Sequence, residues 1–158
     1  MFRELERKNK QLSGSECINI LKNEMRGVLS VVGDNGYPYG MPMNHFYDEE
    51  DCCIYFHCGM SGHRLDSLKK SKKVSFCVCD DGYRNSGEWA LNIKSVIVFG
   101  KIEIIDNEKT VADICRKLSV KFTDDADYID KEINAFLNKT LLLRLVPEHI
   151  CGKLVKES

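Results

Sequence analysis

Three features that this chain of 158 residues lacks exclude whole classes of protein. No apolar run approaches the roughly 20 residues that cross a bilayer as a helix. With 23 basic and 24 acidic residues, the net charge of -1 gives no overall attraction to nucleic acid. The opening residues, MFRELERKNK, are too charged for a signal peptide. We therefore expect a cytoplasmic protein that binds neither membranes nor nucleic acid.

Linkers and repeats are also missing. The chain has only three prolines, no low-complexity stretch and no internal repeat, so nothing in it marks a domain boundary. Its composition, 43% hydrophobic and 30% charged, is that of a soluble globular protein with a core of its own. We expect residues 1–158 to form one domain.

The eight cysteines contain no Cys-x-x-Cys spacing. Disulfides are not expected in a chain with ample apolar residues and no export signal. A zinc site is a second possibility, but Cys77 and Cys79 lie in an apparent strand, where positions two apart share one face beside Val and Phe. We favour free thiols that pack as small hydrophobic groups, and we expect no bound metal.

Turn residues and hydrophobic periodicity predict six strands and four helices. Ser13 and Glu16 form a capping box that begins a helix ending at Gly27. Ser61 caps a second helix, Asn107 opens a third, and a fourth follows the acidic residues 124–127. The expected strands are residues 27–33, 37–48, 52–58, 73–80, 90–105 and 140–146, the last one ended by a proline. Without strict β-α-β alternation, this order predicts a mainly β (β+α) fold, an antiparallel six-stranded barrel with flanking helices.

The segment Ser61-Gly62-His63-Arg64 has the residue types of a phosphate site. A helix start presents free N–H groups, glycine lets an anion approach the backbone, and an arginine can bind two phosphate oxygens at once. An ordinary helix start with a solvated Arg and His remains the plain alternative.

Four motifs surround this segment in an order that resembles a known family. Gly-Tyr-Pro-Tyr-x-x-Pro-x-Asn at residues 36–44, Tyr-Phe-His at 55–57, Gly-His-Arg-Leu at 62–65 and Ser-Val-x-x-x-Gly at 95–100 follow one another. The combination resembles the pyridoxamine 5'-phosphate oxidase-related FMN-binding split-barrel superfamily, and within it the nitroimidazole-resistance flavoproteins. The chain ends LVKES, without the C-terminal segment of a true pyridoxamine phosphate oxidase. We therefore do not expect vitamin B6 oxidation.

The resemblance implies a split β-barrel, an FMN cofactor and a homodimer with FMN at the subunit interface. It also implies the cofactor-binding residues, which are Met41, Pro42, Met43, Asn44, His57, Cys58, Ser61, Gly62, His63, Arg64 and Ser95. In such a site residues 41–44 line the flavin ring. Residues 57, 58 and 61–64 surround the ribityl chain and phosphate, and Ser95 lies near the ring.

His57 is the candidate catalytic residue, because a histidine beside a flavin can transfer protons near neutral pH. The equal alternative is a structural role, in which the His57 ring lies at the strand end and is hydrogen-bonded to backbone or phosphate. The expected function is an FMN-dependent oxidoreductase that passes electrons from a donor such as NAD(P)H to a small-molecule substrate. The competing expectation is a non-catalytic flavin- or haem-binding, or sensing, module.

Overall fold

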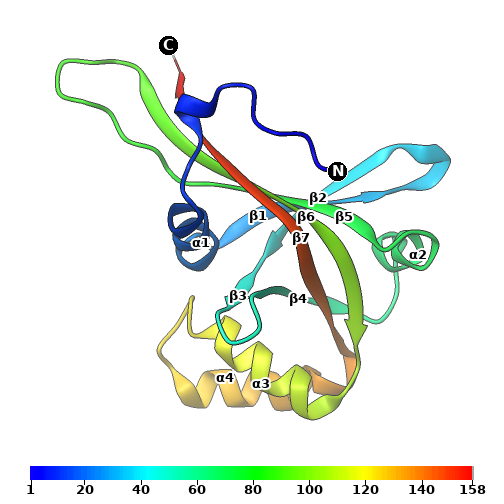
Figure 1. Cartoon of the computed structure of the whole chain (residues 1–158). Helices are drawn as coiled ribbons and strands as arrows, with labels where there is room; N and C mark the ends of the chain where they lie inside the picture. The colour runs from blue at the N-terminus through cyan, green and yellow to red at the C-terminus, as the bar shows by residue number, and fades with distance from the viewer. Residues whose placement is uncertain (158) are drawn as a thin grey trace.

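Seven antiparallel strands form one sheet that curls into a half-barrel (Figure 1). The structure, a computed structural model, describes residues 1–157. The strands are β1 (Arg26–Val32), β2 (Pro38–Asn44), β3 (Phe46–Asp48), β4 (Cys53–Gly59), β5 (Lys73–Cys79), β6 (Leu91–Ile105) and β7 (Thr140–Glu157). The prediction of a mainly β split barrel with flanking helices is confirmed.

The strand order β2-β1-β5-β6-β7-β4-β3 leaves β2 and β3 as the two edges of the sheet. Strand β7 pairs with β6 along one side and with β4 along the other, and so joins the two halves. The curl brings β2 close to β4 across the split, although the two strands do not pair. An edge strand has backbone N–H and C=O groups without a strand partner, and β2 places such groups at the split.

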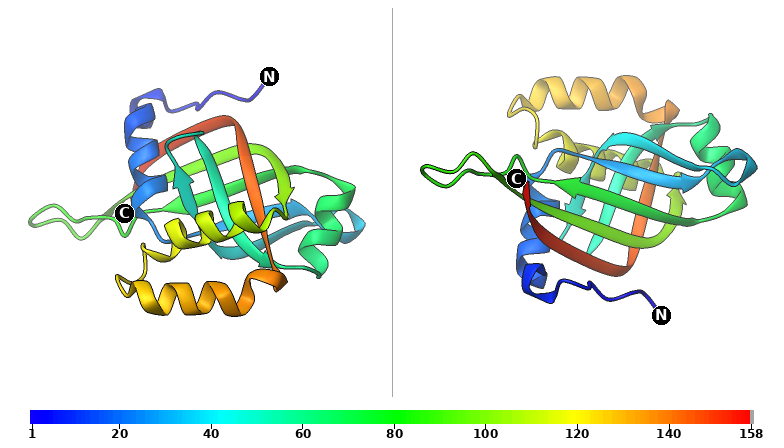
Figure 2. Two further views of the ribbon diagram at one scale, coloured as in Figure 1. Left: turned by 90° about the horizontal axis from the view of Figure 1, so that it is seen from below. Right: turned by 90° about the horizontal axis from the view of Figure 1, so that it is seen from above.

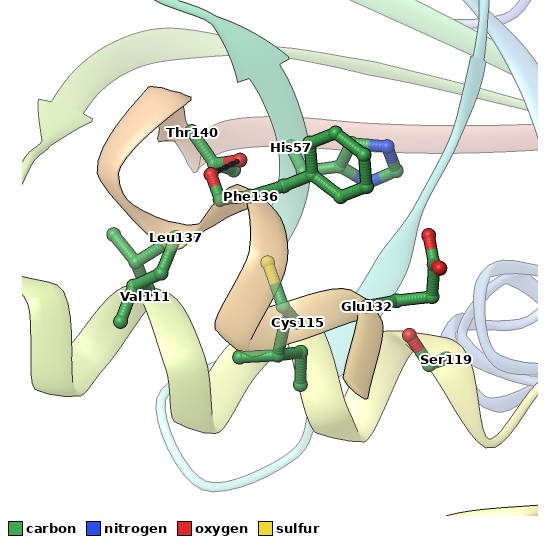
Figure 3. A pocket seen from close by; sticks show the side chains of 9 residues that line it. His57, Val111, Cys115, Ser119, Glu132, Phe136, Leu137 and Thr140 are labelled. Atoms are coloured by element: carbon green, nitrogen blue, oxygen red, sulfur yellow. Dashed lines mark hydrogen bonds between the residues drawn. The ribbon is translucent and has the colours of Figure 1, made fainter. Parts of the chain in front are cut away.

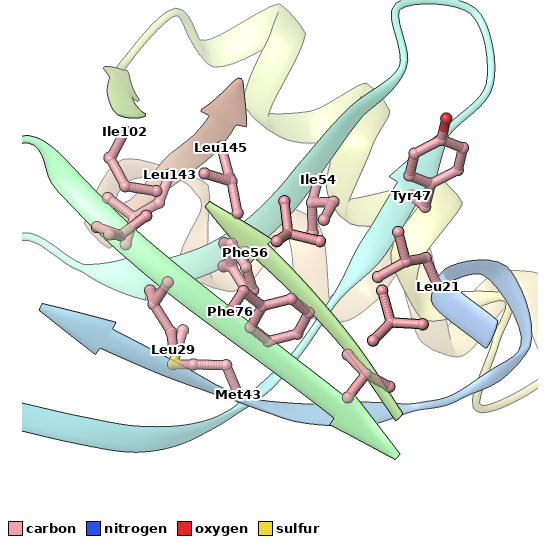
Figure 4. Packing of buried hydrophobic residues seen from close by; sticks show 14 of the residues in the cluster. Leu21, Leu29, Met43, Tyr47, Ile54, Phe56, Phe76, Ile102, Leu143 and Leu145 are labelled. Atoms are coloured by element: carbon pink, nitrogen blue, oxygen red, sulfur yellow. The ribbon is translucent and has the colours of Figure 1, made fainter. Parts of the chain in front are cut away.

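Alternating inward positions of the strands build the main core (Figure 4). Phe56 of β4 and Phe76 of β5 meet edge to face at its centre, with ring centroids 4.9 Å apart and planes at 76°. Leu29, Ile54 and Leu143 are fully buried around them. This pattern is that of a sheet with one face turned to the core.

Four helices lie at the ends and on one side of the barrel (Figure 2). They are α1 (Gly14–Asn23), α2 (His63–Lys70), α3 (Glu108–Ser119) and α4 (Ala126–Phe136), and three short 3-10 turns are η1 (Lys8–Lys10), η2 (Asp34–Gly36) and η3 (Leu137–Lys139). Helix α3 packs Val111 and Ile114 on Tyr55 and Leu142, which face away from the main core. This second cluster fixes α3, and α4 lies beside it.

Three predicted element boundaries differ from the structure. The long second strand is broken at His45, so the sheet has seven strands rather than six. The last strand continues through Pro147 to Glu157, because the β6–β7 register shifts at Gly100 and places the proline at the irregularity. The first helix ends at Asn23, and Met25 lies outside it with 48% of its surface exposed.

The predicted capping box is confirmed, whereas the predicted cap of α2 is wrong. Ser13 accepts from the N–H of Glu16, and the Glu16 carboxylate accepts from the N–H of Ser13. Helix α2 begins instead after Gly62, without a side-chain cap, and Ser61 lies one residue further out. No helix of residues 1–157 is long and apolar enough to cross a membrane.

The cysteines divide between the core and the surface. Cys17, Cys53 and Cys58 are buried, as expected for thiols that pack like small apolar groups. Cys77 and Cys79 share one face of β5, but it is the outer face, since Phe76 and the valines of that strand turn inward. All eight thiols are free.

Candidate functional site

The predicted ring-binding segment is the second half of edge strand β2. Met41 and Met43 point into the barrel and are each only 8% exposed, whereas Pro42 and Asn44 face outward. A ligand at this edge would therefore meet the backbone of the two methionines and the side chains of the other two residues. Proline lacks an N–H group, so Pro42 offers only its carbonyl.

Arg64 connects α2 with this strand. Its Nη1 donates to the thioether Sδ of Met43 at 2.7 Å, while its Nε is buried without a hydrogen-bond partner. A thioether sulfur is a weak acceptor for a guanidinium, which carries five donors in a fixed plane. Arg64 thus retains capacity for an anionic group at the split of the barrel.

The start of α2 presents backbone donors beside Arg64. Gly62, the residue before the helix, has a φ of 123°, which L side chains rarely adopt. No side chain caps the helix, so its first N–H groups lack partners within it. These donors and the positive end of the helix dipole favour an anion. Ser61 and Gly62 are both exposed, which leaves the approach open.

His63 is turned toward the β1–β2 turn. Its ring stacks on Tyr39, with centroids 4.4 Å apart and planes at 18°. Its Nε2 lies 3.4 Å from Oδ2 of Asp34, and Lys70 donates to the other oxygen of that carboxylate at 2.9 Å. The hydrogen bond and charge of Lys70, followed by the charge of His63, lower the pKa of Asp34. His63 and Lys70 thus contact the two oxygens of the Asp34 carboxylate at the surface, and Tyr39 covers one face of the His63 ring.

Cys58 and His57 are successive residues of β4 with opposite orientations. Cys58 faces the main core, where burial raises the pKa of its thiol although the nearby charge of Arg64 acts against this. His57 faces outward and is exposed. Partial desolvation by surrounding protein atoms, together with the positive charge of Arg64, lowers the pKa of His57 below 6.5. The imidazole is therefore mainly neutral at pH 7, when it can both donate and accept a hydrogen bond.

Ser95 lies away from the other predicted residues within one chain. It is on β6, where it pairs with Cys79 of β5 and Lys153 of β7. Strands β1 and β5 separate it from β2, a spacing of roughly 14 Å at the usual distance between strands. The fold of one chain therefore brings together Met43, Cys58 and Arg64, but not Ser95.

His57 also lines a pocket that was not predicted from the sequence (Figure 3). The pocket has a volume of about 150 Å³ and lies between β4, α3, α4 and η3. Cys115 and Ser119 come from α3, and Glu132 and Phe136 from α4. The available signal was the amphipathic pattern of residues 126–136, which places several apolar side chains on one face. That pattern does not state which strand the helix covers.

A seven-stranded antiparallel sheet curled into a half-barrel with flanking helices is the architecture of a split barrel. A family model described as pyridoxamine 5'-phosphate oxidase matches residues 13–154. The chain belongs to this family, which has the FMN-binding split-barrel fold. No curated protein matches it by sequence.

Solved structures with the same fold have low sequence identity to this chain. A conserved hypothetical protein from Mycobacterium tuberculosis aligns with a TM-score of 0.80 and 16% identity, over 95% of this chain and 90% of that one. A proposed 5-nitroimidazole antibiotic resistance protein from Bacteroides thetaiotaomicron gives 0.76 and 16%, over 93% and 87%. A FAD-binding protein from Mesorhizobium loti gives 0.70 and 24%, over 92% and 97%. These alignments confirm the fold.

Proposed function

We propose that this protein is an FMN-dependent oxidoreductase that acts as a homodimer. Bound FMN would supply two-electron chemistry, accepting electrons from a donor such as NAD(P)H and delivering them to a small organic acceptor. The observation that carries the proposal is Arg64, half-buried at the split with a weak sulfur acceptor on one nitrogen and none on another.

The residues around Arg64 fit the phosphate end of such a cofactor. Phosphate oxygens would accept from the Arg64 guanidinium and from the free N–H groups at the start of α2. Ser61 and Gly62 would approach the same group from the open side. In this arrangement His63 stays on Tyr39 and closes one flank.

The free edge of β2 fits the polar side of a flavin ring. Backbone groups of residues 41–44 that have no strand partner can pair with the ring's carbonyl and N–H groups. Pro42 and Asn44 face outward from the same segment. His57, neutral at pH 7 because its pKa is lowered, would hold or transfer a proton beside the ring.

A second copy of the chain completes this proposed site. The outer face of the sheet carries a row of apolar and thiol side chains from successive strands, with Val28 opposite Cys77, Cys77 opposite Ile97, and Ile97 opposite Cys151. Val28 is 41% exposed, and no α-helix covers this face in Figures 1 and 2, although the N-terminal segment borders its Ile97 and Cys151 end. Ser95 lies on the same outer face of β6. Packing of two such faces would therefore place Ser95 of one copy at the barrel split of the other copy.

The first test is the visible spectrum of the purified protein, with the chromophore identified after denaturation. Released FMN supports the proposal, and a colourless protein that does not take up FMN overturns it. Oxidation of NADPH with a nitroaromatic acceptor then tests turnover. A rate no higher than that of free FMN would favour a non-catalytic flavin module, and a Soret band would indicate a haem-binding one.

A further inference from the structure

The pocket beneath α4 is separate from the proposed phosphate site but includes His57, which we place beside the flavin ring. Its apolar walls include Cys115, Phe136 and Leu137 (Figure 3). Of the residues predicted to bind the cofactor, His57 alone lines it. A ligand held here would therefore contact the same imidazole that we place beside the flavin.

The size of the pocket limits what can enter. The pocket is open to solvent on one side, and its volume of about 150 Å³ is close to that of an apolar cavity that takes up one benzene-sized ring. A three-ring flavin would extend well beyond this volume. The walls contributed by Cys115, Phe136 and Leu137 suit the faces of one flat ring.

Polar groups stand at defined points of this apolar lining. Glu132 is half-buried on α4, and its carboxylate, when ionised, only accepts hydrogen bonds. Ser119 and Thr140 add hydroxyl groups, and the Thr140 hydroxyl donates to the carbonyl of Phe136 at 2.8 Å, so its own oxygen is left as an acceptor. The acceptors favour a ligand with an N–H group, and the neutral His57 ring can donate to a second nitrogen.

We propose that this pocket binds a single-ring nitrogen heteroaromatic with one N–H donor and one nitrogen acceptor, held between Glu132 and His57. The ligand would lie next to the proposed flavin site through the shared His57, and in that respect the inference rests on the proposed function. The binding itself follows from the size and lining of the pocket.

Pyrazole and 1-methylpyrazole form a matched pair of probes, because both are neutral single rings and only the first has an N–H group. We would titrate each into the flavin-loaded protein and record ¹H–¹⁵N correlation spectra. Pyrazole should shift residues of β4, α3 and α4 around the pocket, and 1-methylpyrazole should bind at least about fivefold more weakly. Equal binding of the two pyrazoles, or shifts elsewhere in the protein, would overturn the proposal.

Two variants separate the pocket from the rest of the fold. Glu132→Gln should weaken pyrazole binding about fivefold, since a charge-assisted hydrogen bond is replaced by a neutral one. Glu108→Gln makes the same charge change in α3, outside the pocket, and should leave the affinity unchanged. Unchanged affinity in Glu132→Gln contradicts the assignment.

Flavin content, measured by absorbance in the same samples, distinguishes the two proposals. Flavin retained without pyrazole binding would remove this inference and leave the proposed function intact. Pyrazole binding in a protein that takes up no flavin would establish the pocket and remove the oxidoreductase.

Discussion

His45 and Leu21 are joined by a hydrogen bond of 2.8 Å between Nε2 of the histidine and the carbonyl oxygen of the leucine. Leu21 lies in the last turn of α1, where carbonyls have no partner within the helix. Lys121 donates to the carbonyls of Glu24 and His45 at 2.7 and 3.1 Å. The end of α1, the break between β2 and β3, and the segment after α3 thus meet at one buried imidazole.

Stability should fall in acid because of His45. Burial, followed by the charge of Lys121, lowers the pKa of His45 to about 4 in the folded state, against 6.5 ordinarily. Between these values the unfolded chain binds a proton that the folded chain does not, so the folded state loses stability as the pH falls from about 6.5 to about 4, by roughly 3 kcal/mol. Urea unfolding of His45→Gln across this range should show a shallower loss. An identical slope in both proteins contradicts the prediction.

Loss of Arg64 should release the cofactor. Arg64→Ala is expected to weaken FMN retention by about 1.5 to 3 kcal/mol, the range for a hydrogen bond to a charged group. Arg116→Ala is the matched control, because that arginine pairs with Asp130 on the α3–α4 surface. Equilibrium dialysis with FMN measures both variants. Wild-type retention by Arg64→Ala would exclude Arg64 as a phosphate ligand.

Gly100 should not tolerate a methyl group. A Cβ at this position would lie 2.2 Å from the carbonyl oxygen of Val146, which is backbone and has little room to move. We expect Gly100→Ala to lower the free energy of unfolding by about 2 kcal/mol or more. At Gly59 nothing lies within 4 Å of the added carbon, so Gly59→Ala should stay within about 0.5 kcal/mol of wild type. Chemical denaturation compares them, and equal effects would contradict the prediction.

The outer face of the sheet should be sensitive to charge. Val28→Lys places an ammonium group in the apolar row that we propose as the subunit contact, and should weaken dimerisation at least about tenfold. Val120→Lys makes the same change after α3, at a side chain that is 56% exposed, and should leave assembly unchanged. Light scattering after gel filtration gives the masses. If Val28→Lys forms the same dimer as wild type, the interface lies elsewhere.

Local signals predicted most of the fold. The capping box at Ser13 and the acidic turn before α4 depend only on neighbouring residues, and both are found where expected. The break at His45 could not be predicted, because it depends on a hydrogen bond to a helix 24 residues away. The sequence predicts a strand end at Pro147, but the shifted register at Gly100 accommodates this proline, and that shift depends on the pairing of β6 with β7.

The candidate site was predictable in composition and less so in orientation. The motifs name Met43 and Arg64, and the structure brings the two into contact. The inward orientation of Met41 and Met43 depends on the register of β2 against β1. The association of His57 with Glu132 depends on where α4 packs, some 75 residues later in the chain, and no local pattern contains that information.

The position of β7 in the chain also bears on how the protein is made. This strand bridges β6 and β4 but is the last strand of the sheet to emerge during synthesis. Until it is complete, a nascent chain has two further open sheet edges and an uncovered core, surfaces that pair readily with other chains. Closure of the barrel must therefore wait until β7 has been synthesised, and chaperone binding would matter most before that point.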